Sequence, residues 1–305
     1  MSSEPGRGRG VCALVVTYHP DAQLALRVAA VAAQVDAVIL VDNGSDDEAL
    51  AMLRRLALDP AIELIENGAN LGVARALNRG VRRAAERGFD WVLTLDQDSR
   101  AAPDLIEVLF AVRAAHPEPE RLAVLGAGYE DAAMPAAATV AEPWVEVESV
   151  ITSGSLFALP MYRTIGPFRD EFFIDYVDTE FCFRARALGY RIARTRRALM
   201  SHEIGAPTGH RLLGTLKWTT NHSAERRYYI ARNDTVMLRE QGRFRHGGWA
   251  LKSLGRRLRT CRRVLLYERH KAAKIAATLQ GWWHGIRGRM GPRASARRPG
   301  QGPVL

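Results

Sequence analysis

Two carboxylates, Asp96 and Asp98, stand at the end of a short apolar run that begins at Trp91. The run is uncharged and largely aliphatic up to Leu95, which is typical of a strand buried on both faces. Because side chains two apart on an extended chain point the same way, both carboxylates are expected to converge where the strand leaves its sheet. Hard oxygen ligands there suit a divalent cation that also binds substrate phosphates. The Asp-x-Asp spacing is equally compatible with a solvated surface turn, since Asp is a common turn residue.

The elements that must position these carboxylates alternate in type along the chain. Apolar runs predict four strands, at 11–17, 37–41, 62–65 and 90–95. Helical spacing of apolar residues predicts three helices between them, at 21–34, 45–58 and 70–88. Ser45 is expected to cap the second helix, with Glu48 in the capping-box position. Strands that alternate with helices indicate βαβ units, and therefore an α/β fold with a largely parallel sheet.

Polar side chains follow three of these strands directly. They are the runs Thr17-Tyr18-His19, Asp42-Asn43-Gly44 and Asp96-Gln97-Asp98. In a parallel sheet these strand ends lie along one edge, where open α/β sheets bind their ligands. Asp and Asn are also good turn and cap residues, so a purely structural interpretation stays open. No Gly-x-Gly-x-x-Gly or Gly-x-x-x-x-Gly-Lys motif follows any of the strands, which disfavours dinucleotide dehydrogenases and P-loop NTPases.

The charge of this chain is divided unevenly along its 305 residues. From Ala206 to Leu305 there are 22 Lys and Arg against 4 Asp and Glu, whereas the first 205 residues carry 21 against 29. A basic block of this kind points to a solvated surface, an anionic membrane or nucleic acid. The three widely spaced cysteines indicate neither a disulfide framework nor a zinc site, and therefore favour a reducing, cytoplasmic compartment. The polar start of the chain does not resemble a signal peptide, and no apolar stretch is long enough to span a bilayer.

Five blocks resemble those of family 2 glycosyltransferases with the GT-A fold, in unbroken order across about Val11 to Glu203. The blocks are Val15–Pro20, Val41–Ser45, Asn70–Gly80, Leu95–Ser99 and Phe172–Arg186. The last block is similar to the rhamnosyltransferase-like subgroup. The resemblance implies a Rossmann-like, mostly parallel central sheet flanked by helices. It also implies an inverting enzyme that uses a nucleotide-sugar donor, with dTDP-L-rhamnose expected and UDP-galactofuranose or a UDP-hexose as alternatives.

The resemblance assigns the donor to the strand ends. Asp42 is expected to accept a hydrogen bond from N3–H of a uracil or thymine base, which the backbone of Thr17, Tyr18 and His19 would frame. In the Asn70–Gly80 block, the small Gly72 would allow a phosphate to approach a helix start, Arg75 could pair with the diphosphate, and Asn78 would hold the loop. The block is also compatible with an ordinary exposed helix face. The other donor-binding residues expected from the matched blocks are Asn43, Asp96 and Gln97.

A divalent metal, Mg²⁺ or Mn²⁺, is also implied by the resemblance. Asp98 would bind the metal directly, and Asp96 would lie near the ribose and the metal. Many relatives place a further ligand where this chain has His202, although a lone histidine is usually structural. The cation would neutralise charge that grows on the departing nucleoside diphosphate.

The second chemical centre is the acidic block Asp175 to Glu180. Alignment of this block with relatives on its Cys-x-Arg sequence places the general base at Asp178. At the preceding position this chain has Val177, where many relatives have Glu. Glu180 is the second choice for the base. The alternative is that these acids merely favour the first turn of a helix that runs to Leu188.

The pocket for the acceptor and the transferred sugar is expected next to this base. Its predicted residues are Ser153, Gly154 and Asp175. A plain tight turn is an equally good interpretation of the first two. Since no second carboxylate is positioned for a double displacement, a single inverting displacement is favoured.

The remaining segments complete the predicted organisation: a disordered N-terminus at 1–10, a catalytic domain at 11–205, a basic helical region at 206–285 and a disordered tail at 286–305. Basic residues with Leu and Trp predict a helix on an anionic membrane surface, or a helix packed on the catalytic domain with its charges in water. We therefore expect a peripheral protein at the inner face of the cell membrane. Its expected partners are the donor and a glycan or lipid-linked acceptor; an oligomer is compatible with the sequence.

Two other classes of protein share single features with this chain. A phosphatase of the haloacid-dehalogenase type also has Asp-x-Asp after a strand, but normally on the first strand and followed by Thr or Val. A nucleic-acid-binding protein would use the basic region, yet no zinc finger or RNA-recognition block accompanies it, so no nucleic acid is expected as a partner.

Overall fold

A nine-stranded mixed sheet forms the centre of the structure. The structure, a computed structural model, describes residues 10–129, 143–202, 208–212, 215–219, 221–240 and 249–293. The strands of the sheet are β1 (Val11–Thr17), β2 (Ala37–Asp42), β3 (Ile62–Glu66), β4 (Trp91–Asp96), β5 (Ser99–Ala101), β6 (Leu122–Tyr129), β7 (Trp144–Glu146), β8 (Ser155–Ala158) and β9 (Arg191–His202). Their order is β3-β2-β1-β4-β8-β6-β9-β5, with β7 also paired to β9.

The first four strands run parallel, as their alternation with helices predicts. β1 pairs in parallel with both β2 and β4, and β2 pairs in parallel with β3. β8 is antiparallel to β4 and to β6, and β5 and β7 are antiparallel to β9. The sheet is therefore mixed, with six of its nine strands pointing the same way.

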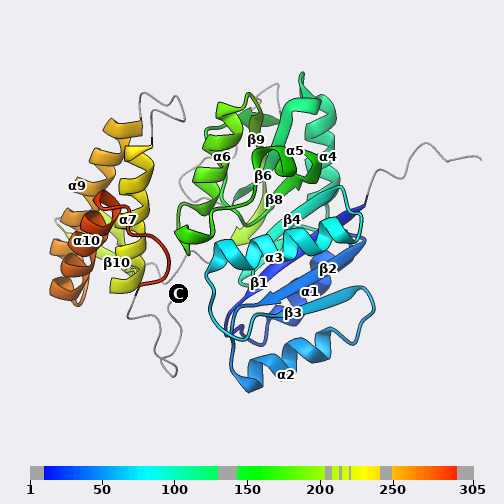
Figure 1. Ribbon diagram of the computed structural model, residues 1–305, viewed down its shortest axis with the longest axis horizontal. Coiled ribbons are helices and arrows are strands. Elements are labelled where there is room, and N and C mark those ends of the chain that lie inside the picture. Colours follow the sequence, from blue (N-terminus) through cyan, green and yellow to red (C-terminus); the bar gives the residue numbers. More distant parts are fainter. Residues whose placement is uncertain are drawn as a thin grey trace, which may run out of the picture.

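Helices cover both faces of this sheet, giving three layers (Figure 1). The helices of the sheet domain are α1 (Leu24–Ala32), α2 (Asp47–Leu56), α3 (Val73–Glu86), α4 (Leu105–Ala115), α5 (Leu159–Ile165) and α6 (Val177–Ala187), with short 3₁₀ turns η1 (Pro119–Arg121) and η2 (Asp170–Phe172). Alternation along β1 sends Cys12 and Leu14 into the core shared with α3, α5 and α6. Ala13 and Val15 point the other way, into the core shared with α1 and α4.

The expected cap of α2 is wrong by one residue. Asp46 is the N-cap, and its Oδ1 accepts a 2.9 Å hydrogen bond from Ala49 N. The Ser45 hydroxyl is engaged elsewhere, because it donates to the carboxylate of Asp42 and accepts a 2.8 Å bond from His19 N. The cap therefore passes to Asp46, the next residue able to accept a backbone N–H.

The basic region after Gly205 contains more than helices. A two-stranded hairpin, β10 (Thr208–Leu212) with β11 (Thr215–Thr219), precedes the helices α7 (Ala224–Arg239), α9 (Trp249–Tyr267) and α10 (Lys271–Ile286). These helices form a bundle beside the sheet (Figure 1). Of the segments expected to be disordered, 1–9 and 294–305 lie outside the described residues. Residues 287–293 are described, and there Arg293 N donates a 2.8 Å hydrogen bond to the hydroxyl of Tyr229 on α7.

The packing of α10 on α7 depends on two glycines one turn apart. A Cβ on Gly281 would lie 2.4 Å from the carbonyl oxygen of Tyr228, and one on Gly285 would lie 2.7 Å from that of Arg232. Both contacts are with backbone atoms, which cannot rotate away. The absence of side chains at these positions therefore lets the two helices approach closely.

Candidate active site

The sheet brings the predicted strand ends together at one edge. In the strand register, Thr17 at the end of β1 lies opposite Asp42 at the end of β2, and Val16 lies opposite Asp96 at the end of β4. Asp96 and Asp98 are half-buried; Asp96 ends β4, and Asp98 lies in the turn that leads into β5. The predicted convergence of the three strand ends is thus confirmed.

Gln97 ties the turn after β4 to the loop after β1. Its side-chain carbonyl accepts a 2.7 Å hydrogen bond from Tyr18 N, and its amide donates a 3.1 Å bond to Tyr18 O. His19 is held against the turn after β2, because its N–H donates to Ser45 Oγ at 2.8 Å and its ring contacts Asp46 at 3.0 Å. Gln97 and His19 therefore shape the edge of the site through the loops that they connect.

Asp42 is almost fully buried, and both its oxygens accept hydrogen bonds. Oδ2 accepts from the backbone N–H groups of Gly44 and Ser45, at 2.9 and 3.1 Å, and Oδ1 accepts from the Ser45 hydroxyl. A carboxylate offers about four lone-pair positions. These bonds use three of them, which leaves one lone pair on Oδ1 for a further donor.

Asn43 serves the structure of the loops. Its carbonyl accepts hydrogen bonds of 3.0 Å from both Asn67 Nδ2 and Leu71 N, and its amide donates to Asn70 Oδ1 at 3.0 Å. These contacts fix the segment that leads into α3. Asn43 thus acts on the site indirectly, by positioning that segment.

The start of α3 is covered by the loop that precedes α6. Gly72 has φ +86°, and a Cβ there would lie 2.8 Å from the carbonyl oxygen of Phe173. Ala74 N also donates to that oxygen, at 3.4 Å. Sequence analysis predicts that Gly72 lets a phosphate approach the start of this helix. In the structure, the backbone of Phe173 makes that close approach.

Arg75 and Asn78, two further polar residues of this block, have different surroundings. Arg75 is largely exposed and forms a long 3.8 Å ion pair with Asp170. Asn78 bonds Phe168 through both its carbonyl and its amide, at 3.0 and 2.7 Å, and contacts Asp170 at 2.6 Å. Asn78 therefore holds the segment 168–170, which lies between α5 and α6.

The turn Thr152-Ser153-Gly154 contacts the Asp96 strand end directly. The Ser153 hydroxyl accepts a 3.1 Å bond from Asp96 N and donates a 2.6 Å bond to Ser99 Oγ. Gly154 has φ +70°, and a Cβ there would lie 2.7 Å from Met200 Cγ, so a larger residue would displace the turn. The turn is thereby fixed on the end of β4.

Asp178 contacts the same turn from the opposite side. Thr152 N donates a 3.2 Å hydrogen bond to Asp178 Oδ2, while Thr179 N donates a 2.6 Å bond to Oδ1. Burial raises the pKa of Asp178 above its ordinary value, although these hydrogen bonds oppose the shift. The structure thus brings together Asp96, at the end of β4, and Asp178, in the first turn of α6, across one short turn.

Tyr129 is a residue of this region that the sequence did not reveal. Its hydroxyl donates a hydrogen bond to Ser153 O, and burial raises its pKa, with the negative charges of Asp96 and Asp178 adding to the effect. The phenol therefore lies close to both carboxylates. A tyrosine at the end of a buried strand carries no sequence signal that would distinguish it from a core residue.

The two other acids of the Asp175–Glu180 block have different surroundings. Glu180 is 2% exposed and forms a two-point ion pair with Arg184, at 3.1 and 3.0 Å, and Arg184 in turn donates to Ile165 O. This favours a structural function for Glu180 over its use as a base. Asp175 Oδ1 accepts from Arg226 at 3.2 Å, whereas its buried Oδ2 has no hydrogen-bond partner among the described residues.

The donor atoms at the end of β4 fit a divalent cation. Asp96 and Asp98 supply hard carboxylate oxygens, and Mg²⁺ is usually held by one or two carboxylates together with substrate phosphates. Among the described residues, no three His, Cys, Asp or Glu side chains gather closely enough to hold a metal by themselves. The backbone of His202 lies opposite Ser99 in the strand register, and its side chain is outside the described part of the chain.

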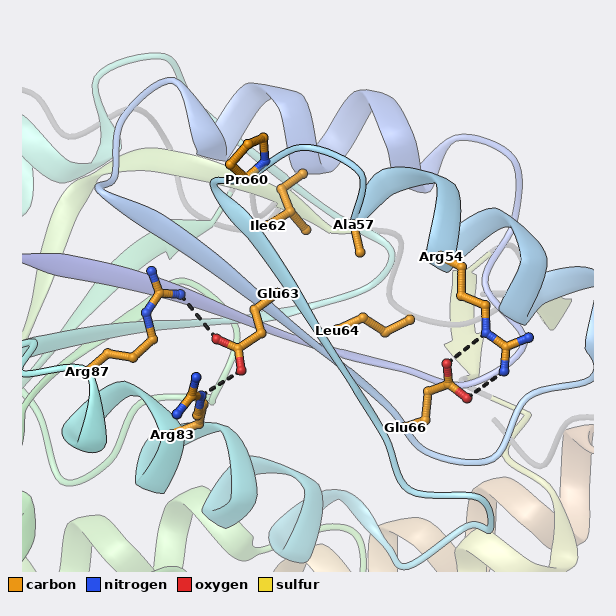
Figure 2. Close-up of a pocket in the computed structure, with 9 residues that line it drawn as sticks. All are labelled: Arg54, Ala57, Pro60, Ile62, Glu63, Leu64, Glu66, Arg83 and Arg87. Atoms are coloured by element: carbon orange, nitrogen blue, oxygen red, sulfur yellow. Dashed lines mark hydrogen bonds and ion pairs between the residues drawn. The ribbon is translucent and has the colours of Figure 1, made fainter.

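A hollow of about 650 Å³ lies elsewhere, beside the edge strand β3. Figure 2 shows that its charged side chains pair with one another: Arg54 reaches Glu66, while Arg83 and Arg87 converge on Glu63. This strand is separated from β4 by β2 and β1. Each charged side chain of the hollow is paired with one of opposite charge, and charged residues on an edge strand also discourage pairing with another sheet, so we assign the hollow no ligand.

Comparison with known proteins finds similarity to glycosyltransferases. Residues 12–125 match the family described as Glycosyl transferase family 2. The chain is 28% identical over 247 residues to the dTDP-rhamnosyl transferase RfbF of Shigella flexneri, a match that covers 75% of this chain and 80% of that protein. It is 27% identical over 167 residues to the N-acetylglucosaminyl-diphospho-decaprenol L-rhamnosyltransferase of Mycobacterium tuberculosis (strain CDC 1551 / Oshkosh), covering 51% of this chain. That match spans about half, 49%, of the mycobacterial protein.

The fold is shared with solved glycosyltransferases. The mannosyltransferase PcManGT from Pyrobaculum calidifontis, solved in complex with GDP-Man and Mn²⁺, matches with a TM-score of 0.59 and 16% identity over 92% of this chain and 88% of that one. At this identity the similarity concerns the fold alone. The expected GT-A architecture, α/β with helices on both faces of a central sheet, is confirmed.

Proposed function

We propose that this chain, a family 2 glycosyltransferase, transfers L-rhamnose from dTDP-L-rhamnose to a hydroxyl of a glycan or lipid-linked acceptor in cell-surface polysaccharide synthesis. The observation that carries the reaction type is the turn 152–154, which contacts Asp96 on one side and Asp178 on the other. The choice of sugar is supported by the names of the two relatives. UDP-galactofuranose and a UDP-hexose are the alternative donors.

The donor is assigned to the ends of β1, β2 and β4. Asp42 Oδ1 has room for the N3–H of a thymine or uracil base, beside the backbone of Thr17 and Tyr18. Arg75 is exposed and only loosely paired, so it is available to contact the diphosphate. Asp96 and Asp98 would hold a divalent cation, which when bound neutralises negative charge on the departing diphosphate.

Transfer requires one bond to form and one to break at the anomeric carbon of the sugar. The acceptor oxygen attacks that carbon while its proton passes to the Asp178 carboxylate. The bond between the anomeric carbon and the diphosphate oxygen breaks, and its electron pair leaves with the nucleoside diphosphate. Attack from the face opposite the leaving group inverts the configuration. A carboxylate raised in pKa by burial is a stronger base than one in water, which suits it to this step.

Asp175 is the candidate to orient the acceptor. Its Oδ2 is buried without a hydrogen-bond partner among the described residues, and a buried oxygen of this kind is costly unless a ligand supplies a donor. An acceptor hydroxyl next to the one that reacts would satisfy it. Ser153 and Gly154 would form the adjoining wall of the sugar pocket.

A membrane surface is the proposed setting for the acceptor. No helix in the described part of the chain has the length and apolar character required to cross a bilayer. The helix α9 exposes leucines Leu251, Leu254, Leu258, Leu265 and Leu266 next to exposed arginines Arg259, Arg262 and Arg263. Leucines flanked by cations favour the interface of an anionic membrane, at its cytoplasmic face.

The donor assignment is tested by a panel of nucleotide sugars in thermal-shift measurements with and without Mn²⁺, because a ligand that binds the folded state raises its apparent stability. We expect dTDP-L-rhamnose to give the largest shift, and the shift to grow with the metal. A larger shift with a UDP-sugar would transfer the proposal to that donor. Release of phosphate from a simple monoester without any donor binding would contradict a glycosyltransferase function.

A further inference from the structure

The loop that carries Asp175 and leads to Asp178 has an unusual backbone. Within residues 171–176, here named the acceptor loop, Phe173, Asp175 and Tyr176 have φ of +67°, +63° and +64°. Residues other than glycine rarely adopt this left-handed conformation, and each instance costs free energy that surrounding contacts must offset. Something outside the loop must therefore hold it in place.

The side chain of Asn233, in the middle of α7, contacts three carbonyl groups of this loop. Its Nδ2 lies 3.0 Å from Phe172 O, 2.8 Å from Ile174 O and 2.8 Å from Asp175 O. Since all three partners are acceptors, the amide nitrogen must face the loop. Asn233 is fully buried, so no water competes for these bonds.

Arg232 holds the first half of the same loop. Its Nη2 donates to Glu171 O at 3.1 Å and to Phe172 O at 2.9 Å, and its Nη1 donates to Gly291 O. The guanidinium is fully buried and lies 5.0 Å from the centre of the Tyr229 ring. Its charge is therefore balanced by carbonyl dipoles and aromatic faces around the loop.

Two further residues of α7 contact the side chains of the acceptor loop. Arg226 pairs with Asp175 Oδ1 at 3.2 Å, and Asp234 Oδ1 accepts a 3.0 Å bond from the hydroxyl of Tyr176. Asp234 is anchored in turn by Ser253 and Arg257 of α9, at 2.7 and 2.6 Å. The loop is thus bonded to α7 through both its backbone and its side chains.

We infer that Arg232 and Asn233 are positioning residues for transfer: they fix the acceptor loop so that Asp175 and Asp178 face the turn 152–154. This inference rests on the proposed function only for the identity of the base. The basic C-terminal helices then have a direct part in forming the active site, in addition to any contact with a membrane. They act directly on the acceptor half of the site, whereas the strand ends assigned to the nucleotide base and the metal belong to the sheet domain. The acceptor loop also touches the donor half where Phe173 O accepts a bond from Ala74 N at the start of α3.

Asn233→Asp is the sharpest test, because it keeps the shape of the side chain but replaces the donating NH₂ with an oxygen that repels the three carbonyls. We expect kcat to fall roughly a hundredfold, as for a catalytic group displaced by about 1 Å. The donor-induced thermal shift should stay that of the parent. Amide hydrogen exchange at residues 172–176, measured without any ligand, should accelerate at least about tenfold as the loop opens.

Thr235→Val is the matched control on the same helix. Thr235 is buried, bonds Ala231 O and Arg257, and makes no hydrogen bond to the acceptor loop. It should lose stability without a change in kcat or in exchange of the loop. If Asn233→Asp does not fold, Asn233→Ser, which keeps one donor, is measured in its place, and an intermediate acceleration of exchange is expected.

Parent-like kcat and parent-like exchange of the loop in the Asn233 variants would overturn the inference. The exchange measurement also separates it from the proposed function. Fast exchange of the loop in Asn233→Asp supports positioning even if no tested donor gives transfer. Unchanged exchange of the loop in the Asn233 variants, together with loss of activity in Asp178→Asn, would support Asp178 as the base and reject Arg232 and Asn233 as positioning residues.

Discussion

Thr152 N donates a 3.2 Å hydrogen bond to Asp178 Oδ2, so the turn that contacts the end of β4 also holds the carboxylate of α6. The turn binds Oδ2 of that carboxylate, and Thr179 binds the other oxygen, Oδ1. The carboxylate is therefore fixed before any acceptor arrives, which favours proton removal in a defined direction.

Asp178→Asn is expected to lower kcat by about 10²–10⁴-fold, the range for loss of a general base, because an amide cannot accept the acceptor proton. The variant keeps the shape of the side chain, so donor binding by thermal shift should match that of the parent. Transfer is measured as release of nucleoside diphosphate in the presence of acceptor. Near-normal turnover in Asp178→Asn would show that the base lies elsewhere.

Glu180→Gln separates the second candidate base from a structural function. Because Glu180 is buried against Arg184, its neutralisation should lower the free energy of unfolding by about 1–3 kcal/mol, the cost of leaving a charged group poorly paired. kcat measured well below the melting temperature should change little. A loss of kcat as large as that of Asp178→Asn, without loss of stability, would instead make Glu180 the base.

The pH dependence of transfer should report the raised pKa of Asp178. Only the ionised carboxylate accepts a proton, so kcat/KM should fall as the pH drops through this pKa, which lies above the ordinary value of about 3.9. The negative charge of Asp175 contributes to raising that pKa. Asp175→Asn should therefore move the acidic limb to lower pH; a limb that stays in place or moves upward contradicts this coupling.

Asp98→Ala should lower the rate of transfer by about 10²-fold or more. It should also remove the added thermal stabilisation that Mn²⁺ gives in the presence of a nucleoside diphosphate. Chelation of the metal in the parent should have the same effect on both measurements. Glu107→Ala, an exposed carboxylate of α4, is the control and should leave both unchanged. Persistence of the metal-dependent shift in Asp98→Ala would remove this residue from the metal site.

His222, just before α7, should make stability depend on acidic pH. Burial and the nearby charges of Arg226, Arg227 and Lys274 lower its pKa to about 3, whereas the pKa of a histidine in the unfolded chain is about 6.5. Between these values the unfolded chain binds a proton that the folded chain does not, so the free energy of unfolding falls as the pH falls. Denaturation at pH 7 and pH 4 should show a smaller loss in His222→Asn than in the parent; equal losses would exclude this contribution.

Gly281→Ala should destabilise the contact between α10 and α7, because the added Cβ meets the carbonyl oxygen of Tyr228 at 2.4 Å. Overpacking of this kind typically costs about 1–3 kcal/mol. The change is measured by denaturant unfolding, with Ala276→Gly on the exposed face of α10 as the control for intrinsic helix propensity. Full stability of Gly281→Ala would mean that the two helices can move apart without cost.

Local and periodic features of the sequence were sufficient for the first half of the fold. The four parallel strands and the acids that follow them could be predicted because a buried apolar run or a turn residue is recognised from its neighbours in the sequence. The strand β5 has only three residues and β8 has four, which is too short for a pattern. Their antiparallel pairing depends on partners far along the chain, and no local signal specifies it.

The candidate site shows the same division. Asp96, Asp98 and Asp178 could be named from motifs, and the structure adds the turn 152–154, which contacts both Asp96 and Asp178. The structure also adds contacts that Asn43, Gln97 and Gly72 each make with backbone atoms of a loop far along the chain. Such contacts depend on the tertiary fold, and residue type alone does not reveal them.

The bonds between α7 and the acceptor loop also bear on how such enzymes can diversify. A chimera that joined this sheet domain to the C-terminal helices of a relative would have to keep a donor at 233 and a guanidinium at 232, or the proposed base, Asp178, would be misplaced. Recombination between relatives is therefore constrained at the boundary between the sheet domain and the C-terminal helices. The order of the elements along the chain gives no sign of that constraint. The crossover points compatible with activity are those that transfer residues 171–176 together with α7.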